Sequence, residues 1–283
     1  MQDIRANNVD RFLGYSQFYD QNRPVPPADV VRILTRYLTD APNRVVDVGC
    51  GTGLSSFIWL DQAKDIIGVE PNDDMRETAI SHWQSQQRPK NLRFVKGISD
   101  QLELDSNSVD ILTCSQSFHW MDPQPTLRHC GNLLVCCVMV ESLLRDGGVF
   151  AAYDCDWPPT FTKEVEEHYH TLIALAEARA RVIELAPAEQ LAFKWDKNKH
   201  LQQIRESQLF SFSKEIVFHQ WERCEANRYA NIALSQGGLQ TALKLGADDL
   251  HKEIQAFQDH VQEAFASQTQ DILFSYRMRL GIK

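Results

Sequence analysis

Residues 45–53 read Val-Val-Asp-Val-Gly-Cys-Gly-Thr-Gly, a short apolar run that leads into three glycines at alternate positions. The β-branched run is typical of a buried strand, and Leu54–Leu60 resumes an apolar pattern that is typical of a helix. A glycine turn between a strand and a helix lets a ligand approach the backbone closely, beside the free N–H groups of the helix. The stretch therefore predicts a ligand-binding turn at Gly49, Gly51 and Gly53.

The spacing between this turn and the next strand-end acid, Glu70, indicates the kind of ligand. Glu70 lies 21 residues after Gly49, at the end of a second buried-strand run over Ile66–Val69. In nucleotide-binding sheets, an acid about 20 residues after the turn accepts hydrogen bonds from a ribose diol. The alternative is a tight structural turn followed by a solvated acid. The glycine spacing disfavours a dinucleotide site, whose fingerprint is G-x-G-x-x-G.

The chain around the turn alternates between strand and helix patterns. An amphipathic helix over 27–38 precedes the first strand, and Asn72 caps a helix that extends to about Trp83. Short strands are separated by helical or turn-rich sequence, as parallel crossover units require. The predicted strands are Arg44–Val48, Ile66–Val69, Leu92–Val95, Val109–Thr113 and Val149–Tyr153. This alternation predicts five parallel strands with helices on both faces.

The C-terminal half has a different pattern. Helical patterns over 163–185 and 187–207 predict a cap over 160–209, after a first part over 1–159. The remaining part, 210–283, is predicted to complete the sheet. It contains an imperfect strand at 210–218, a helix at 248–266 and a strictly alternating strand at 272–280. The last of these strands has one buried face.

Composition limits the classes of function. The chain has 283 residues with 29 basic and 38 acidic side chains, which gives a net charge of −9. An acidic chain without basic runs offers little attraction to nucleic acid or anionic lipid. Its seven cysteines form neither a CxxC pair nor a Cys/His ladder, so neither zinc nor a disulfide framework is indicated. Without a signal-peptide pattern or a long apolar run, we expect a cytoplasmic protein, monomeric or homodimeric.

Several motifs together resemble one family. VVDVGCGTG followed by IIGVEP resembles the class I S-adenosylmethionine-dependent methyltransferases. SVDILTCSQSFHWMD is similar to the fourth-strand motif of that family, and LLRDGGVFAAYDCDWPP to its fifth-strand region. YDQNRPVPP is similar to the N-terminal segment of small-molecule members related to trans-aconitate methyltransferase. The resemblance is best over about residues 15–160. It implies a Rossmann-like seven-stranded sheet, mostly parallel with the last strand antiparallel, and a helical cap insertion.

The resemblance also implies positions that hold S-adenosylmethionine. The glycine backbone would face the methionine part, and Glu70 would bind the ribose. Ser99 would border the adenine, although the family more often has an acid there, and Asp100 is a possible substitute. Ser115 and Gln116 would lie beside the methionine or the reacting sulfur. The complete expected set is Asp47, Gly49, Cys50, Gly51, Gly53, Glu70, Pro71, Ile98, Ser99, Ser115 and Gln116.

The sequence indicates the residues that bind the methyl acceptor less clearly than those that bind the cofactor. Methyl transfer from a sulfonium is a direct displacement, so a base is needed only where the acceptor must lose a proton. His119 is the candidate catalytic base, with packing against Trp120 as the alternative. Tyr19 and Arg23 are expected in a lid segment, where Arg23 pairs with a carboxylate or else lies exposed at a helix edge. Asp154 and Asp156, at the end of the fifth strand, are expected to face the pocket without a metal.

The leading hypothesis is methyl transfer to a small molecule, with a carboxylate or hydroxyl oxygen favoured as the acceptor. The alternatives are a cofactor-binding protein without turnover and, third, a nucleotide-sugar or NAD enzyme. Residues Cys130 to Met139 lengthen one segment relative to similar sequences. This insert is a helix extension, a contact surface for a second subunit, or an irregularity of the sequence such as a splice product.

Overall fold

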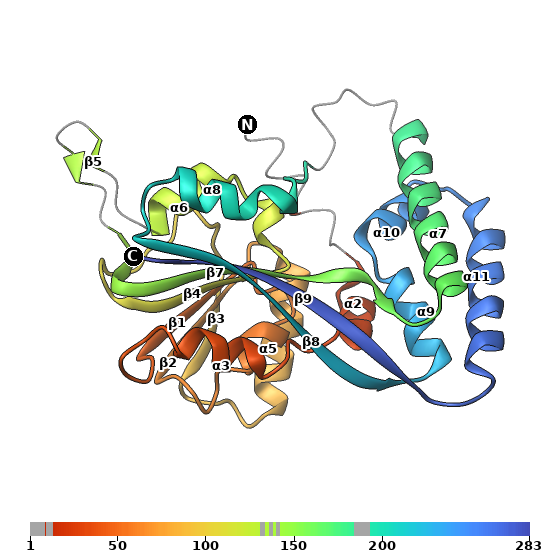
Figure 1. Cartoon of the computed structure of the whole chain (residues 1–283), viewed down its shortest axis with the longest axis horizontal. Helices are drawn as coiled ribbons and strands as arrows, with labels where there is room; N and C mark the ends of the chain where they lie inside the picture. The colour runs from red at the N-terminus through yellow and green to blue at the C-terminus, as the bar shows by residue number, and fades with distance from the viewer. Residues whose placement is uncertain (1–8, 10–13, 131–133, 136–137, 140–141, 184–192) are drawn as a thin grey trace. The chain divides into compact units, whose positions relative to one another are not determined.

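The computed structural model describes residues 9, 14–130, 134–135, 138–139, 142–183 and 193–283 (Figure 1). The chain divides into two compact units. The core unit contains residues 25–154, 193–218 and 277–283, and the helical unit contains residues 1–24, 155–192 and 219–276. Three long strands contribute residues to both units. The domain boundaries expected from the sequence, after residues 159 and 209, stay a prediction.

Seven strands form one sheet, in the order β3-β2-β1-β4-β7-β9-β8. They are β1 (Arg44–Val48), β2 (Asp65–Val69), β3 (Leu92–Val95), β4 (Val109–Ser115), β7 (Leu144–Thr160), β8 (Phe212–Cys224) and β9 (Gln270–Ile282). The first five predicted strands are confirmed, with β7 extending well beyond Val149–Tyr153. The strands from β3 to β7 are parallel to their neighbours.

The last strand is antiparallel, as predicted. Lys283, at the end of β9, exchanges backbone hydrogen bonds with Gly147 and Gly148 near the start of β7. Along β8 and β9 the residue numbers change in opposite directions, since Ser211 contacts Ile282 whereas His219 contacts Ser275. The Rossmann-like seven-stranded fold expected from the sequence is therefore confirmed.

Short helices connect the strands of the core unit. They are α3 (Asp29–Thr35), α4 (Leu54–Phe57), α5 (Asp73–Ser85), η1 (Phe118–Trp120), α6 (Pro123–Cys130), η3 (Lys197–Lys199) and α8 (His200–Glu206). Helices α6 and α8 lie on one face of the sheet, and α3 and α5 lie on the other (Figure 1). The predicted cap at Asn72 is confirmed, because its side chain accepts a hydrogen bond from Met75 N at 3.0 Å.

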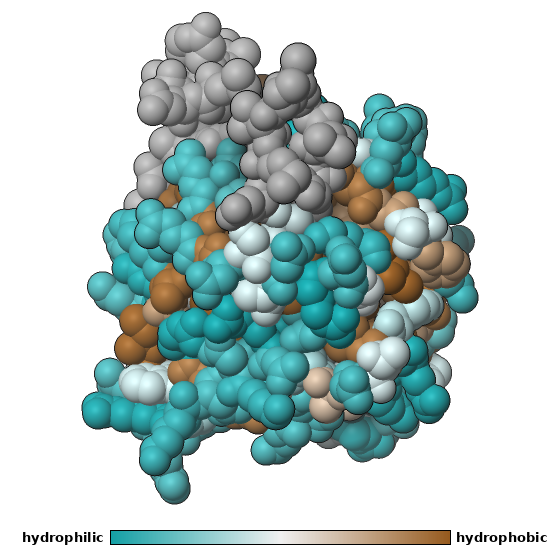
Figure 2. Space-filling model, turned by 90° about the vertical axis from the view of Figure 1, so that its left-hand side faces the viewer, coloured by the Kyte–Doolittle hydropathy of each residue, from teal (hydrophilic) through white to brown (hydrophobic). Residues whose placement is uncertain are grey.

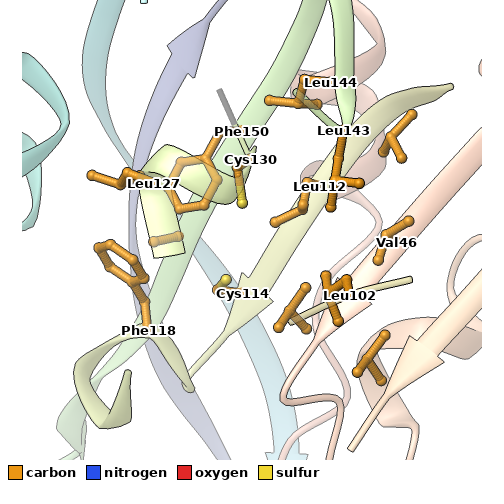
Figure 3. Packing of buried hydrophobic residues seen from close by; sticks show 14 of the residues in the cluster. Val46, Leu102, Leu112, Cys114, Phe118, Leu127, Cys130, Leu143, Leu144 and Phe150 are labelled. Atoms are coloured by element: carbon orange, nitrogen blue, oxygen red, sulfur yellow. The ribbon is translucent and has the colours of Figure 1, made fainter. Parts of the chain in front are cut away.

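A dry apolar cluster holds α6 against the sheet (Figure 3). Leu127 and Cys130 of α6 point toward Leu112 of β4 and Phe150 of β7, and these four side chains are fully buried. Burying an apolar side chain of this size stabilises the fold by about 1.5–3 kcal/mol. The packing fixes the segment after β4, and with it the position of η1.

Among its described residues, the helical unit contains α2 and four longer helices. They are α2 (Ser16–Asn22), α7 (Lys163–Ile183), α9 (Ala226–Leu234), α10 (Gly237–Lys244) and α11 (Leu250–Phe265). Helix α11 buries Phe257, Val261 and Phe265, as its sequence spacing predicted. Helices α9 and α10 were not predicted, because their apolar stripes are short and Gly237 and Gly238 occur at the junction between them.

Two expectations for the connecting segments need correction. The predicted helix over 187–207 is wrong for residues 193–196, because Asp196 caps η3 by accepting a hydrogen bond from Asn198 N at 2.9 Å. Its residues 187–192 lie outside the described residues. The insert is not a helix extension, since α6 ends at Cys130 and β5 (Leu134–Val135) pairs antiparallel with β6 (Val138–Met139). The other residues of the insert also lie outside the described ones.

The face of the molecule shown in Figure 2 is largely hydrophilic. Figure 2 shows a face on which hydrophilic side chains dominate and hydrophobic ones form small, separate patches among the residues not drawn in grey. Searched over its described residues, the structure contains no helix both long and apolar enough to span a membrane. No group of three or more potential metal ligands was found over the same residues.

Candidate active site

The glycine turn begins from a buried acid at the end of β1. Asp47 is fully buried and accepts hydrogen bonds from Ser55 Oγ at 2.6 Å, Ser56 Oγ at 2.7 Å and Thr113 Oγ1 at 3.0 Å. Burial raises the pKa of Asp47, while the three hydroxyls oppose that rise. The acid thus connects the strand to the helix after the turn and fixes the shape of the loop between them.

The three glycines of the turn all have left-handed backbone angles, but their surroundings differ. At Gly49 (φ +67°) a methyl group would come within 2.7 Å of Ser117 Cβ. At Gly53 (φ +88°) it would come within 2.8 Å of the Phe94 ring. At Gly51 (φ +57°) no heavy atom lies within 4 Å of such a methyl group. Gly49 and Gly53 are required by packing, whereas Gly51 faces open space.

Glu70 closes the turn from the end of β2. Its Oε2 accepts a hydrogen bond from Gly51 N at 2.8 Å, and its Oε1 accepts one from Asn72 N at 2.8 Å. The side chain is buried, and this burial raises the pKa of Glu70 to about 7. A solvated acid, the alternative considered from the sequence, is therefore excluded. The acid and the turn form one hydrogen-bonded unit.

The other predicted cofactor residues lie at the same carboxyl edge of the sheet. Ser99, after β3, is buried and shares a hydrogen bond with Thr126 Oγ1 at 2.7 Å. Gln116, after β4, has a positive φ of 50° and donates its backbone N–H to Tyr153 O at 2.8 Å. Cys50 is buried, while Pro71, Ile98 and Ser115 are half-buried. Ligands of open parallel sheets bind at this edge.

His119 lies in η1, just after β4, and is 4% exposed. Its Nδ1 is 3.3 Å from Asp154 Oδ1, and its backbone oxygen accepts a hydrogen bond from Trp195 N at 2.8 Å. The His119 and Trp120 rings are 4.8 Å apart. Burial, reinforced by the Lys197 cation, lowers the pKa of His119 to about 3. The imidazole is therefore neutral at pH 7, and its ring is tilted by 52° relative to that of Trp120.

Asp154 is the centre of a buried ionic cluster. Lys197 Nζ lies 2.7 Å from its Oδ1, and Arg279 Nη1 lies 3.5 Å from its Oδ2. His200, which is fully buried, has Nδ1 at 3.8 Å from Oδ2. Although burial opposes ionisation, the neighbouring Lys197 and His119 hold the pKa of Asp154 well below its usual range. The predicted strand-end acid is thus the anchor for four basic side chains.

Arg23, the predicted lid arginine, belongs to the helical unit. It is 8% exposed, so the expected alternative of an exposed helix-edge arginine is wrong. Its guanidinium carbon is 4.9 Å from the centre of the Tyr19 ring and 4.8 Å from that of Trp157. Its Nη2 donates to Ser235 O at 3.1 Å and to Gln236 Oε1 at 3.2 Å. A lid role for Tyr19 and Arg23 stays a prediction.

Comparison with known proteins identifies the core. A family model described as "Methyltransferase domain" matches residues 46–135, which contain the glycine turn, Glu70, η1 and α6. This chain carries a class I methyltransferase domain. The chain is 28% identical over 137 residues to the probable S-adenosylmethionine-dependent methyltransferase CRG1 of Saccharomyces cerevisiae, covering 48% of this chain and 44% of the yeast protein.

Two further comparisons support the assignment. The chain is also similar to the ubiquinone biosynthesis O-methyltransferase of Coxiella burnetii, with 28% identity over 140 residues, 47% of this chain and 59% of that protein. A candidate type II methyltransferase structure from Anaeromyxobacter dehalogenans superposes with a TM-score of 0.64 at 18% identity, covering 92% of this chain and 97% of that one. The chain thus spans about half the length of the curated relatives that it matches. The likeness to trans-aconitate methyltransferase stays a prediction.

The sequence did not predict several residues that complete these clusters. Lys197, His200 and Arg279 surround Asp154, while Trp157 and Gln236 surround Arg23. Arg279 gave no signal of its burial, because it occupies a polar position of the strictly alternating last strand. The others come from segments far apart in the chain, and no local pattern connects them.

Proposed function

We propose that the methyltransferase domain binds S-adenosylmethionine on the Gly49–Gly53 turn and transfers the methyl group to an oxygen of a small molecule. The observation that carries this proposal is the unit formed by Gly51 and Glu70, in which an open backbone position lies beside a buried acid. A ribose diol donates hydrogen bonds, and a buried carboxylate is a strong acceptor for them. The yeast relative is named as a probable S-adenosylmethionine-dependent methyltransferase, which is consistent with the proposal.

The residues of the turn fit this cofactor. The space next to Gly51 admits a ligand against the backbone, and Glu70 retains acceptor capacity beyond its two backbone hydrogen bonds. When bound, the cofactor supplies an electrophilic methyl group on a sulfonium. The remaining requirements on the chain are to hold the acceptor in line with that methyl group and to exclude water. The predicted contacts of Asp47, Cys50, Pro71, Ile98, Ser99, Ser115 and Gln116 belong to this proposal.

The state of His119 favours an acceptor that has no proton to lose. A histidine whose pKa is about 3 is a weak base at neutral pH. A carboxylate oxygen needs no base, whereas a hydroxyl needs one. We therefore place a carboxylate ahead of a hydroxyl as the acceptor, with His119 and Trp120 as walls of the acceptor site. The oxygen acceptor is also in line with the name of the Coxiella relative.

A binding and turnover experiment tests the proposal directly. Isothermal calorimetry with S-adenosylmethionine measures binding, and release of S-adenosylhomocysteine is then followed with a panel of carboxylic acids and alcohols. Binding accompanied by methyl ester formation is the expected result. Binding without product from any acceptor supports a cofactor-binding protein without turnover. Thermal stabilisation by NAD(P) or a UDP-sugar, but not by S-adenosylmethionine, contradicts the proposal.

A pair of glycine variants tests the position of the cofactor. Gly51→Ala and Gly246→Ala each place a methyl group in open space on a left-handed residue, with φ of +57° and +84°. Each should lose a similar stability of about 1 kcal/mol. Only Gly51→Ala should weaken S-adenosylmethionine binding, because only that methyl group points into the proposed site. Equal cofactor affinity of the two variants contradicts the placement.

Glu70→Ala tests the ribose contact. We expect S-adenosylmethionine affinity to fall by about 1–3 kcal/mol, because the diol loses a charge-assisted acceptor. Calorimetry of the variant with S-adenosylmethionine and with 2′-deoxy and 3′-deoxy analogues separates this contact from a general loss of the turn. If the wild type does not discriminate against the deoxy analogues, the ribose assignment is wrong.

A further inference from the structure

Two histidines of the helical unit meet between two of its long helices. His168 belongs to α7 and His260 to α11, and their Nδ1 atoms are 3.0 Å apart. The two helices lie side by side (Figure 1) and are antiparallel, since Arg179 of α7 pairs at 2.7 Å with Asp249, just before α11. Because both histidines are inside helices, rigid elements rather than loops set the distance between them.

The histidine pair lies at the boundary between the core of the helical unit and solvent. Phe257, one turn before His260 on α11, is fully buried, and its ring meets that of His168 edge-on with centroids 5.3 Å apart. The side chains of His168 and His260 are both half-buried. Packing on Phe257 thus restrains the pair from the inside, while water and small ions reach it from the outside.

The distance between the two Nδ1 atoms suits neighbouring ligands of one metal ion. With a Zn–N bond of about 2.0–2.1 Å, two imidazole nitrogens on one ion lie about 2.8–3.0 Å apart at a right angle and about 3.3–3.4 Å apart in a tetrahedron. The observed 3.0 Å falls within this span. In the structure the same distance serves a hydrogen bond between the rings. An ion replaces that bond when both rings carry their proton on Nε2 and turn their Nδ1 lone pairs to a common point.

The charges around the pair favour a cation. Burial, reinforced by the charge of His260, lowers the pKa of His168 from its usual value of 6.5, although the carboxylate of Glu253 opposes this change. The His168 imidazole is therefore mostly neutral at pH 7, which is the form that binds metal. Helical spacing also puts an exposed acid, Glu164, one turn before His168 on α7. Negative charge from these two acids offsets the charge of a bound ion.

We propose that His168 and His260 form a binding site for a divalent transition-metal ion of the class that prefers imidazole ligands, which includes Zn²⁺, Ni²⁺ and Cu²⁺. Among the described residues the pair belongs to no cluster of three or more histidine, cysteine or acidic ligands, so water completes the coordination. The bound ion links α7 to α11. The site lies wholly in the helical unit, so its test does not depend on the cofactor proposed for the core unit.

A zinc titration followed by NMR tests the site. The full chain, labelled with ¹⁵N at histidine, is titrated with Zn²⁺ at pH 7, and Mg²⁺, which prefers oxygen ligands, is the control ion. We expect the Nδ1 resonances of His168 and His260 to shift together and to saturate at the same Zn²⁺ concentration, with no shift from Mg²⁺. If neither ring responds to Zn²⁺, the pair is a hydrogen bond only and the proposal is wrong.

Variants of the two ligands separate one shared ion from two independent histidines. Loss of even an outer-shell partner of a metal ligand costs about 10–100-fold in affinity, and loss of a ligand should cost no less. In His168→Gln the Zn²⁺ affinity reported by His260 should therefore fall by at least about tenfold, and His260→Gln should do the same to His168. His170→Gln, at an exposed histidine of α7, is the matched control and should change neither. Unchanged affinity at His260 in His168→Gln overturns the proposal.

Stability provides a second readout of the same site. An ion that binds only the folded state raises the midpoint of urea unfolding. Zn²⁺ should therefore raise the midpoint of the wild type and of His170→Gln, and this increase should be lost in His168→Gln and in His260→Gln. Backbone NMR spectra that match the wild type show that α7 and α11 are intact in each variant. If both folded ligand variants gain as much stability from Zn²⁺ as the wild type, the stabilising ion binds elsewhere and the proposal fails.

Discussion

Asp154 in the core unit and Arg23 in the helical unit are both buried charges, but their environments are opposite. Asp154 is 2% exposed and has Lys197, Arg279, His119 and His200 around its carboxylate. Arg23 is 8% exposed and contacts only neutral acceptors and aromatic rings among the described residues. Among the described residues, the first charge has basic side chains around it, and the second has no acidic one.

This difference separates a buried charge with ionic partners from one that has only neutral partners among the described residues. A buried charge with several partners stabilises the arrangement of the segments that supply them, since removing one partner leaves the others unpaired. A buried charge without an ionic partner costs stability, because its desolvation is not offset by a counter-charge. Four measurements test this contrast, and they are given in order of decreasing expected effect.

Removing Asp154 should have the largest effect. Asp154→Ala leaves the buried Arg279 guanidinium without one of its two carboxylate partners and Lys197 without its own. We expect the free energy of unfolding in urea to fall by about 3–5 kcal/mol. The matched control is Asp146→Ala at a fully exposed acid paired with Lys283, which should change stability little. Equal effects of the two variants would show that the cluster does not stabilise the core unit.

Glu70 provides the next test, through pH. The unfolded carboxyl ionises near 4.5, whereas in the folded protein its pKa is about 7. Between these values the folded state holds the proton more tightly, so the free energy of unfolding should fall as pH rises, by up to about 3 kcal/mol. Urea titrations from pH 4.5 to 8 measure this slope, and Glu70→Gln should remove its share. An unchanged slope in the variant contradicts the assignment.

Arg23→Met should have a smaller effect in the ligand-free protein. The variant loses two hydrogen bonds of about 1 kcal/mol each, and it also removes the cost of burying an unpaired cation. The net change in the free energy of unfolding should therefore stay below about 2 kcal/mol. A loss as large as that of Asp154→Ala would mean that Arg23 is already neutralised in the free protein.

The smallest effect is expected for Lys197→Met. Lys197 is one of several partners of Asp154 and is partly exposed. Its loss should cost about 1 kcal/mol of stability. It should also raise the pKa of His119, although burial, the larger cause, should keep that pKa below 6.5. Histidine NMR titration measures the change, and an unaltered His119 would show that Lys197 does not act on it.

Local sequence patterns were sufficient to predict the structure of the segments around the proposed cofactor site. The glycine spacing, the distance to Glu70 and the cap at Asn72 are all properties of continuous sequence, and each was found in the structure. The alternation of strands and helices predicted the parallel part of the sheet for the same reason. Helices α9 and α10 were missed because their short apolar stripes become decisive only when α7 and α11 cover them.

The sequence by itself therefore determined that Gly49–Gly53 and Glu70 form a turn-and-acid pair on a parallel sheet. The backbone conformation of this turn and the alternation of strands and helices around it depend on residues that are close in sequence. They can therefore be predicted from local patterns. Only the tertiary structure decided which buried charges are neutralised. Asp154 meets Lys197 and Arg279 from segments more than 40 residues away, and Arg23 meets Gln236 more than 200 residues away. The electrostatic free energy of a buried charge depends on all the groups that surround it in space. Residue order along the chain does not show which groups these are.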